Sequence, residues 1–248
     1  MLANPSRFGL ACPADVVGTP IAIAFPMQKS MVPWVLPMAL FVVGNVLEGK
    51  LPTSAYPVAY SAKVLLVLIA TIACGRAWKA DLKLDRRSTG LGLLAGLIGI
   101  VAWLAIESIP YPHLGARTAF DPFTRIGDPI VRTAFLGIRF LGLAMLVPVI
   151  EEVFWRGFGL RFASDVVKPV EGGWRGLAIG SHAHIANLVV SVVFGLAHPE
   201  WLAGTVFAFG MGVLLGGTRS LGACVVAHAT TNLLLGCWVI FRSAWALW

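Results

Sequence analysis

Charged residues are scarce in this sequence. Only 12% of its 248 residues are Asp, Glu, Lys or Arg, whereas 58% are hydrophobic. A typical soluble domain has about 25% charged and about 45–50% apolar residues. So few charges cannot cover the surface of a soluble protein of this size, which excludes an ordinary cytosolic enzyme and a disordered chain. The composition instead predicts a polytopic membrane protein.

Other signals are missing as well. There are only four cysteines and none forms a CxxC pair, which excludes a disulfide scaffold; three of them lie in or beside apolar runs, as small buried hydrophobic residues do. No strand-like alternation and no internal repeat is evident. The HExxH signature of a local zinc site is also absent. The fold class that remains is all-α, a polytopic transmembrane helical bundle.

Apolar runs follow one another from Met31 to Phe241 and predict about seven membrane spans. The spans are Met31–Val46, Tyr56–Cys74, Gly90–Ile106, Phe140–Phe162, Ile185–His198, Trp201–Gly217 and Leu221–Phe241. Residues 1–30 contain four prolines and no sustained apolar run. We interpret them as a leader outside the membrane or as the result of a mis-called start codon.

The basic residues predict the orientation of the spans. The chain has 19 Lys and Arg against 12 Asp and Glu, a net charge of +7. In a soluble protein this excess would favour nucleic-acid binding, but in a membrane protein Lys and Arg gather on the cytoplasmic side. Five of them lie in the loop 75–89, which is therefore expected in the cytoplasm. This places the N-terminus inside and the loop 107–128 outside, and no nucleic-acid partner is expected.

A few polar residues lie inside the fourth span, where a charge costs on the order of 3 kcal/mol. Glu152 and Arg156 are one turn apart and can form an ion pair. Glu151 points roughly 100° away from Glu152, so it is either protonated or meets an imidazole or water. A buried glutamate beside a histidine suits general-base activation of water. The alternative is an ordinary ion pair at the interfacial end of a helix.

Two histidines supply candidate partners. His228 and Asn232 are one turn apart on one face of the last span, where they could polarise a carbonyl and stabilise an oxyanion. A helix–helix hydrogen bond is the alternative for this pair. His198 ends the fifth span, and a helix-end histidine bonded to backbone or to a lipid headgroup is its simpler interpretation. One shared site requires a common membrane depth, so either the fifth helix continues past Pro199 with a kink or its predicted end is wrong.

Taken in order, EExxxR, FxxxH and HxxxN resemble the motifs of the CPBP (ABI) family of intramembrane proteases, whose relatives include the eukaryotic Ras-converting CAAX proteases. The matching residues are Glu151, Glu152, Arg156, Phe194, His198, His228 and Asn232. The resemblance covers residues 140–241. It implies that residues 131–248 form a CPBP protease-like domain, preceded by the N-terminal transmembrane helices of residues 31–130.

The resemblance implies an intramembrane endopeptidase that hydrolyses a peptide bond of a membrane-anchored protein or peptide in the lipid bilayer. In the metal-free mechanism, which we favour, Glu151 is the general base and His198 helps it to activate water. His228 with Asn232 then holds the oxyanion, and the adjacent ion pair fixes the helix. In the metal mechanism, Glu151, His198 and His228 would bind one divalent metal ion, zinc, and leave a fourth position open.

A finer resemblance concerns the stretches VPVIEEVFWRGFGLRF, HPEWLAG and HATTNLLLG and the tryptophan-ended terminus. They look like a bacterial subfamily associated with exosortase/PEP-CTERM protein sorting. This implies a protein of the bacterial inner or plasma membrane with an exosortase sorting system as partner. Outside the proteases, the alternatives are a membrane scaffold or immunity-type protein, and a transporter that uses the same residues as a proton relay. No inverted repeat supports the transporter.

Overall fold

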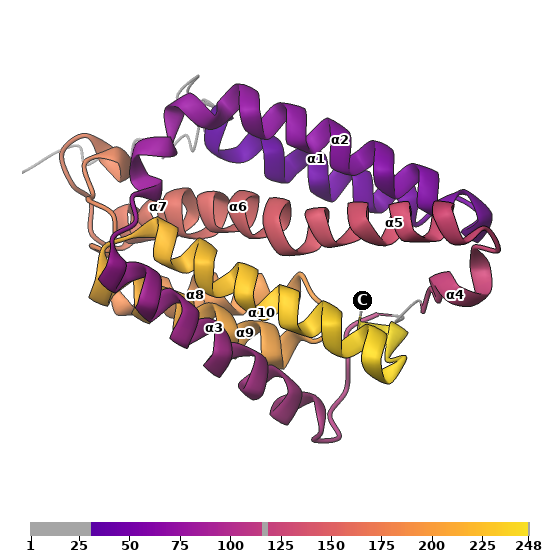
Figure 1. Cartoon of the computed structure of the whole chain (residues 1–248). Helices are drawn as coiled ribbons and strands as arrows, with labels where there is room; N and C mark the ends of the chain where they lie inside the picture. The colour runs from indigo at the N-terminus through magenta and orange to yellow at the C-terminus, as the bar shows by residue number, and fades with distance from the viewer. Residues whose placement is uncertain (1–30, 116–118, 248) are drawn as a thin grey trace, which may run out of the picture.

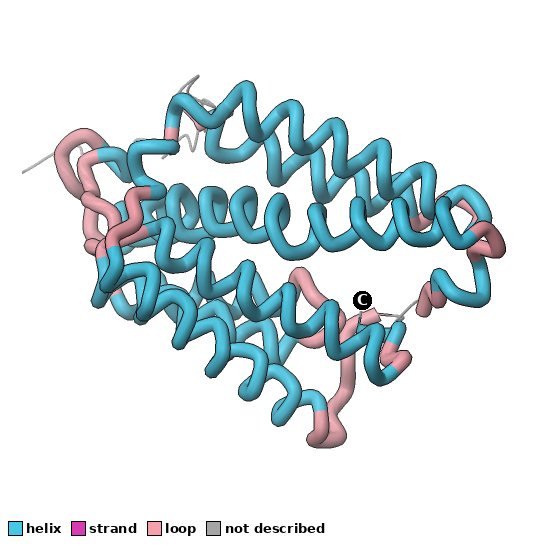
Figure 2. The backbone as a smooth tube through the Cα atoms, in the orientation of Figure 1, coloured by secondary structure: helices cyan, strands magenta, loops and turns pink. Residues whose placement is uncertain are grey.

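A computed structural model describes residues 31–115 and 119–247, so the predicted leader, residues 1–30, lies outside the described residues. The described part is a bundle of helices without strands (Figures 1 and 2). The all-α fold class is therefore confirmed. The α-helices are α1 (Val32–Glu48), α2 (Tyr56–Cys74), α3 (Arg86–Glu107), α4 (Pro122–Arg125), α5 (Pro129–Leu141), α6 (Val147–Glu152), α7 (Leu160–Val167), α8 (His184–Leu196), α9 (Trp201–Thr218) and α10 (Leu221–Arg242). Short 3₁₀ turns cover Thr53–Ala55, Gly75–Ala77, Lys79–Leu82, Gly173–Arg175 and Trp245–Leu247.

Five helical stretches of the described chain are long and apolar enough to cross a membrane. They are Thr53–Ala77, Arg86–Glu107, Pro129–Val167, Trp201–Thr218 and Leu221–Arg242. The other two predicted spans are shorter apolar helices, α1 with 17 residues and α8 with 13. A helix of 13 residues is about 20 Å long, less than the hydrocarbon core of about 30 Å. On the outside of the bundle, Ile72, Ile98 and Val101 are 61–70% exposed, a surface suited to lipid.

The fourth predicted span is longer than expected. It was placed at Phe140–Phe162, but the helical stretch runs from Pro129 to Val167. The start is set by Asp128, whose side chain accepts hydrogen bonds from the first backbone N–H groups of α5. Two π-helical segments, Gly142–Leu146 and Val153–Gly159, join α5, α6 and α7 into one rod. The earlier start was not predicted because Arg139 is charged and was taken to lie outside the span. In the structure Arg139 is buried, and its guanidinium lies 4.7 Å from the ring of Tyr60.

Helices α3 and α10 pack with their backbones in close contact (Figure 1). A Cβ atom on Gly92 would lie 2.7 Å from the carbonyl oxygen of Ala223, and one on Gly96 would lie 2.6 Å from that of Ala227. Thr231 also donates a hydrogen bond from its Oγ1 to the carbonyl of Gly96 at 3.0 Å. Small residues permit this approach, which is typical of helix pairs in membranes. The contact fixes α10, the helix that carries His228 and Asn232.

A tight turn of residues 197–200 joins α8 to α9 and carries His198. Of the two alternatives for the fifth span, continuation past Pro199 is excluded and the predicted end at His198 is wrong, because α8 ends at Leu196. The loop after α3 holds this turn, because the N–H of Leu114 donates to the carbonyl of Pro199 at 3.0 Å and Nε1 of Trp201 donates to the carbonyl of Pro112 at 2.9 Å. Two parts of the chain that are far apart in sequence thus meet at this end of the bundle.

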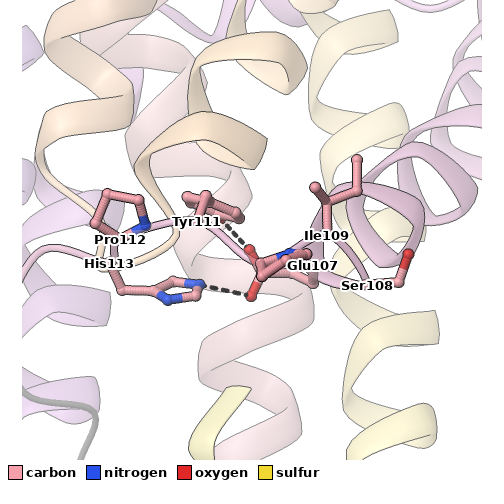
Figure 3. A pocket seen from close by; sticks show the side chains of 7 residues that line it. Glu107, Ser108, Ile109, Tyr111, Pro112 and His113 are labelled. Carbon is pink, nitrogen blue, oxygen red and sulfur yellow. Dashed lines mark hydrogen bonds and ion pairs between the residues drawn. The ribbon is translucent and has the colours of Figure 1, made fainter.

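The same loop forms a pocket of its own (Figure 3). There Nε2 of His113 lies 3.2 Å from Oε2 of Glu107, and the hydroxyl of Tyr111 donates a hydrogen bond to the other oxygen of this carboxylate. The Tyr111 ring also contacts the Trp201 ring edge to face, at 6.1 Å between centroids. The polar side chains of this loop therefore bond to one another and stabilise the loop.

Helices α8 and α9 approach each other at Gly195. A Cβ atom there would lie against Oγ1 of Thr205 and 2.5 Å from the carbonyl oxygen of Trp201. We expect Gly195→Ala to lower the free energy of unfolding by about 1–3 kcal/mol, because overpacked helix pairs must separate. Gly210→Ala on the same α9 is the control, since its Cβ would meet nothing within 4 Å. Denaturant titration of the two variants in detergent measures the difference, and equal stability would contradict this packing.

Candidate active site

The site is built around His228, which α10 places opposite the fourth span. Its Nδ1 lies 2.8 Å from Oε1 of Glu152, and Oε2 of the same carboxylate lies 3.3 Å from Nε of Arg156. The predicted ion pair between Glu152 and Arg156 is therefore present. The two glutamate oxygens serve different partners, so one carboxylate links the histidine to the arginine. A carboxylate accepts hydrogen bonds, so Nδ1 of His228 is the donor to Glu152, and in the neutral imidazole Nε2 is then the acceptor.

Glu151 lies on the other side of the same imidazole. Its Oε2 is 4.0 Å from Nε2 of His228 and accepts no hydrogen bond. Glu151 is 4% exposed and His228 is also 4% exposed. Burial of a carboxylate without a hydrogen-bond partner is costly. Such a group is expected only where its chemistry is needed, so Glu151 is the strongest candidate for a reacting group here.

Both adjacent glutamates reach one histidine, although neighbours on an α-helix diverge by about 100°. The second π-helical segment, Val153–Gly159, begins directly after Glu152. Widening of a helix at such a segment changes the directions of the side chains around it, and π-segments are frequent at functional sites. Of the alternatives considered for Glu151, the structure places it near an imidazole, and this is the imidazole that Glu152 also contacts.

Arg156 is enclosed by the short helix α8 and by α9. It is 2% exposed, its Nη2 donates to the carbonyl of Ala208 at 3.2 Å, and its guanidinium lies 4.9 Å from the ring of Phe194. The positive charge therefore sits inside the bundle beside a fully buried Glu152. This arrangement excludes the alternative of an interfacial helix end, where both charges would be solvated.

Asn232 lies one turn beyond His228, as predicted, and one of its amide hydrogens is used between helices. Its Nδ2 donates a hydrogen bond to the carbonyl of Leu143 at 2.9 Å. Leu143 belongs to the first π-helical segment. The helix–helix hydrogen bond considered as the alternative for Asn232 is therefore present. The oxyanion role of Asn232 stays a prediction, which rests on its second amide hydrogen.

His198 stands apart from the carboxylates. Its Nδ1 lies 2.8 Å from the carbonyl of Phe194, and its ring stacks on the Phe194 ring at 4.6 Å between centroids. The bond to backbone is the simpler interpretation considered for a helix-end histidine. Phe194 in turn contacts the ring of His228 at 6.4 Å. The structure thus brings His228, rather than His198, within ion-pair distance of Glu151, and the help of His198 in activating water stays a prediction.

A metal site needs several donor side chains within reach of one ion. In the part of the chain that the structure describes, no three His, Cys, Asp or Glu side chains come together in a group that could hold a metal ion. The three candidates Glu151, His198 and His228 are not gathered in such a group. As they stand, these residues do not fit a zinc ion, and no reaction step below passes through one.

Two contributors to the site were missed in the sequence. The ring of Phe207 on α9 lies 5.1 Å from the ring of His228, and the carbonyl of Leu143 receives Asn232. Phe207 is one apolar residue among many in its span, so nothing in the sequence predicts that it contacts His228. The glycine-rich pattern of that span predicts close helix approach, which is the only hint that its side chains reach a neighbour.

The fold is that of a helical membrane protein, and its buried Glu–His–Arg cluster joins the fourth span to α10. Residues 133–234 match the family model described as Type II CAAX prenyl endopeptidase Rce1-like. The matched segment contains every residue of the three motifs. This segment, less than half of the chain, is therefore similar to the family of CAAX-type endopeptidases that the motifs predict. Comparison with curated proteins and with solved structures gave no match, and the exosortase-associated subfamily stays a prediction.

Proposed function

We propose that this protein is an intramembrane endopeptidase that hydrolyses a peptide bond of a membrane-anchored protein with water held between Glu151 and His228. The observation that carries the proposal is the pair of facing acceptor atoms 4.0 Å apart, Oε2 of Glu151 and Nε2 of His228, inside the bundle. The family match supports the reaction class. It also supports a CAAX-type sequence in the substrate, which for this chain is part of the proposal.

The proposed reaction uses the two acceptors together. Two atoms 4.0 Å apart can both lie within about 2.8 Å of one water oxygen, which then donates one O–H to each. The water oxygen attacks the peptide carbonyl carbon while Glu151 takes one proton. The C–N bond then breaks, and the leaving amine receives that proton. Glu152 holds the imidazole in the tautomer that accepts at Nε2, and the second amide N–H of Asn232 is the proposed donor to the oxyanion.

The test is cleavage by the purified protein in liposomes. The probe is an internally quenched peptide with a farnesylated CAAX terminus, and a second peptide carries a palmitoyl anchor instead. We expect the folded wild-type protein to cleave one of them, with two fragments that mass spectrometry identifies as products of hydrolysis. The variant Glu151→Ala/His228→Ala lacks both water-holding groups and is expected to give no fragments. Equal cleavage by both proteins would contradict the water-holding role of Glu151 and His228, and no cleavage by either would favour a non-enzymatic alternative.

Metal dependence is decided in the same assay. We expect cleavage to persist after incubation with EDTA and dialysis, because the proposed water is activated by a carboxylate and an imidazole. Loss of cleavage that zinc chloride restores would instead support the metal mechanism, in which Glu151, His198 and His228 are the proposed ligands.

A further inference from the structure

A cavity of about 500 Å³ lies at the end of the bundle where the chain enters α3 and leaves α9, and neither Glu151 nor Glu152 lines it. Its volume falls within the range of about 300–1,000 Å³ that is typical of small-molecule sites. Its charged lining residues are Asp81, Lys83, Arg161, Arg175 and Arg219. Four basic side chains against one acidic side chain make this a strongly positive cavity.

Arg161 is the lining residue whose side chain is held in place by the surrounding protein. Its side chain is 9% exposed and its guanidinium lies between two rings, 4.9 Å from that of Trp34 and 5.0 Å from that of Trp174. The Nε group donates to the carbonyl of Gly157 and Nη1 donates to that of Leu177. Backbone bonds and stacking therefore fix the plane of this guanidinium before any ligand arrives.

One donor of this fixed guanidinium is unused. Nη2 of Arg161 is buried and donates no hydrogen bond, and Oδ2 of Asp81 lies 4.0 Å from it, too far for one. A buried guanidinium nitrogen without an acceptor is costly. An anion with several oxygens would satisfy it, since planar arginine donors match phosphate geometry.

The other basic side chains come from separate elements that meet at this end (Figure 1). Lys83 follows a 3₁₀ turn and Arg175 ends another. Arg219 takes the left-handed conformation at the end of α9, with φ of 52°, where glycine is the usual residue. Their convergence is what a multidentate anion needs. The same end is the one that the basic loop 75–89 predicts to be cytoplasmic, where anionic lipid headgroups lie.

We propose that this cavity binds a phosphate group of net negative charge, carried by an anionic phospholipid or by a free phosphate ion, with Nη2 of Arg161 as its buried donor. Lys83 and Arg219 contact the outer phosphate oxygens. The site is independent of the peptidase centre, so it stands even if the protein cleaves no peptide.

The test is a ligand titration of the thermal unfolding midpoint in dodecyl maltoside. The probes are dihexanoyl-phosphatidylglycerol, the zwitterionic dihexanoyl-phosphatidylcholine as its neutral counterpart, and inorganic phosphate against chloride at equal ionic strength. A ligand that binds only the folded protein raises the midpoint and yields an apparent Kd. We expect a rise with phosphatidylglycerol and none with phosphatidylcholine.

Two double variants make the test specific to the cavity. Lys83→Gln/Arg219→Gln removes two charges from the lining, and we expect the apparent Kd to rise at least about tenfold. Arg86→Gln/Arg87→Gln removes the same charge from exposed residues outside the lining and is expected to keep the wild-type Kd. A rise with phosphatidylglycerol alone identifies a lipid ligand, and one with inorganic phosphate as well identifies a site for the free ion. No rise with either probe, or equal Kd values for the two variants, overturns the proposal.

Discussion

Replacing Glu151 by glutamine is expected to lower kcat for the quenched peptide by about 10²- to 10⁴-fold, the usual contribution of a general base. This corresponds to about 2.7–5.4 kcal/mol of activation free energy. The change keeps the shape of the side chain, so KM should stay as in the wild-type protein. Stability should be unchanged or higher, because Oε2 of Glu151 is buried without a hydrogen bond and the neutral amide is cheaper to bury.

The matched control is Glu48→Gln on α1. Glu48 also lies in a helix, and its Oε2 is 2.5 Å from Nζ of Lys63. It is about 100 residues away from Glu151 in the sequence. Its replacement leaves the buried Lys63 without its counter-charge and should lower stability while kcat per folded protein is retained. The two substitutions are thus expected to have opposite effects on activity and stability. An unimpaired kcat in Glu151→Gln would contradict the proposed mechanism.

The sequence predicted the helices better than it predicted their ends. Apolar runs identify α2, α3, α9 and α10 because hydrophobic length is a direct requirement of the bilayer. The start of the fourth span was misplaced because hydropathy treats Arg139 as polar, whereas aromatic rings of α2 accommodate its guanidinium. The π-helical segments have no composition signal at all. They follow from tertiary packing, which a one-dimensional pattern does not contain.

In the candidate site, too, the sequence predicted some contacts, whereas others depend on how the helices pack. Motif order and the i,i+4 spacing were enough to pair Glu152 with Arg156 and to select His228. They could not show that Glu151 shares that histidine, because the sequence does not contain the distance between the fourth span and α10. Spacing also could not distinguish an oxyanion donor from a helix–helix bond at Asn232, since both need the same amide on the same face. Contacts between helices, rather than periodicity along one helix, decide these roles.

Replacing Arg156 by methionine is expected to lower the free energy of unfolding by about 3–5 kcal/mol, the usual cost of breaking a buried ion pair from one side. Glu152 is 0% exposed, so its charge would remain inside the bundle with only His228 beside it. Titration with a denaturing detergent in mixed micelles measures the loss. The exposed Arg125→Met is the control, expected to stay within about 0.5 kcal/mol of the wild-type value.

The double variant Glu152→Gln/Arg156→Met distinguishes the contribution of the Arg156 charge to stability from the contribution of its packing. Glutamine keeps an oxygen that accepts from Nδ1 of His228 but carries no charge that needs a counter-ion. Most of the stability lost in Arg156→Met should therefore return, because replacing a whole buried pair is often close to neutral. Equal losses in the single and the double variant would mean that Arg156 stabilises the bundle through its packing on Phe194 and its bond to Ala208. Recovery would show that its main task is to neutralise the carboxylate that orients His228.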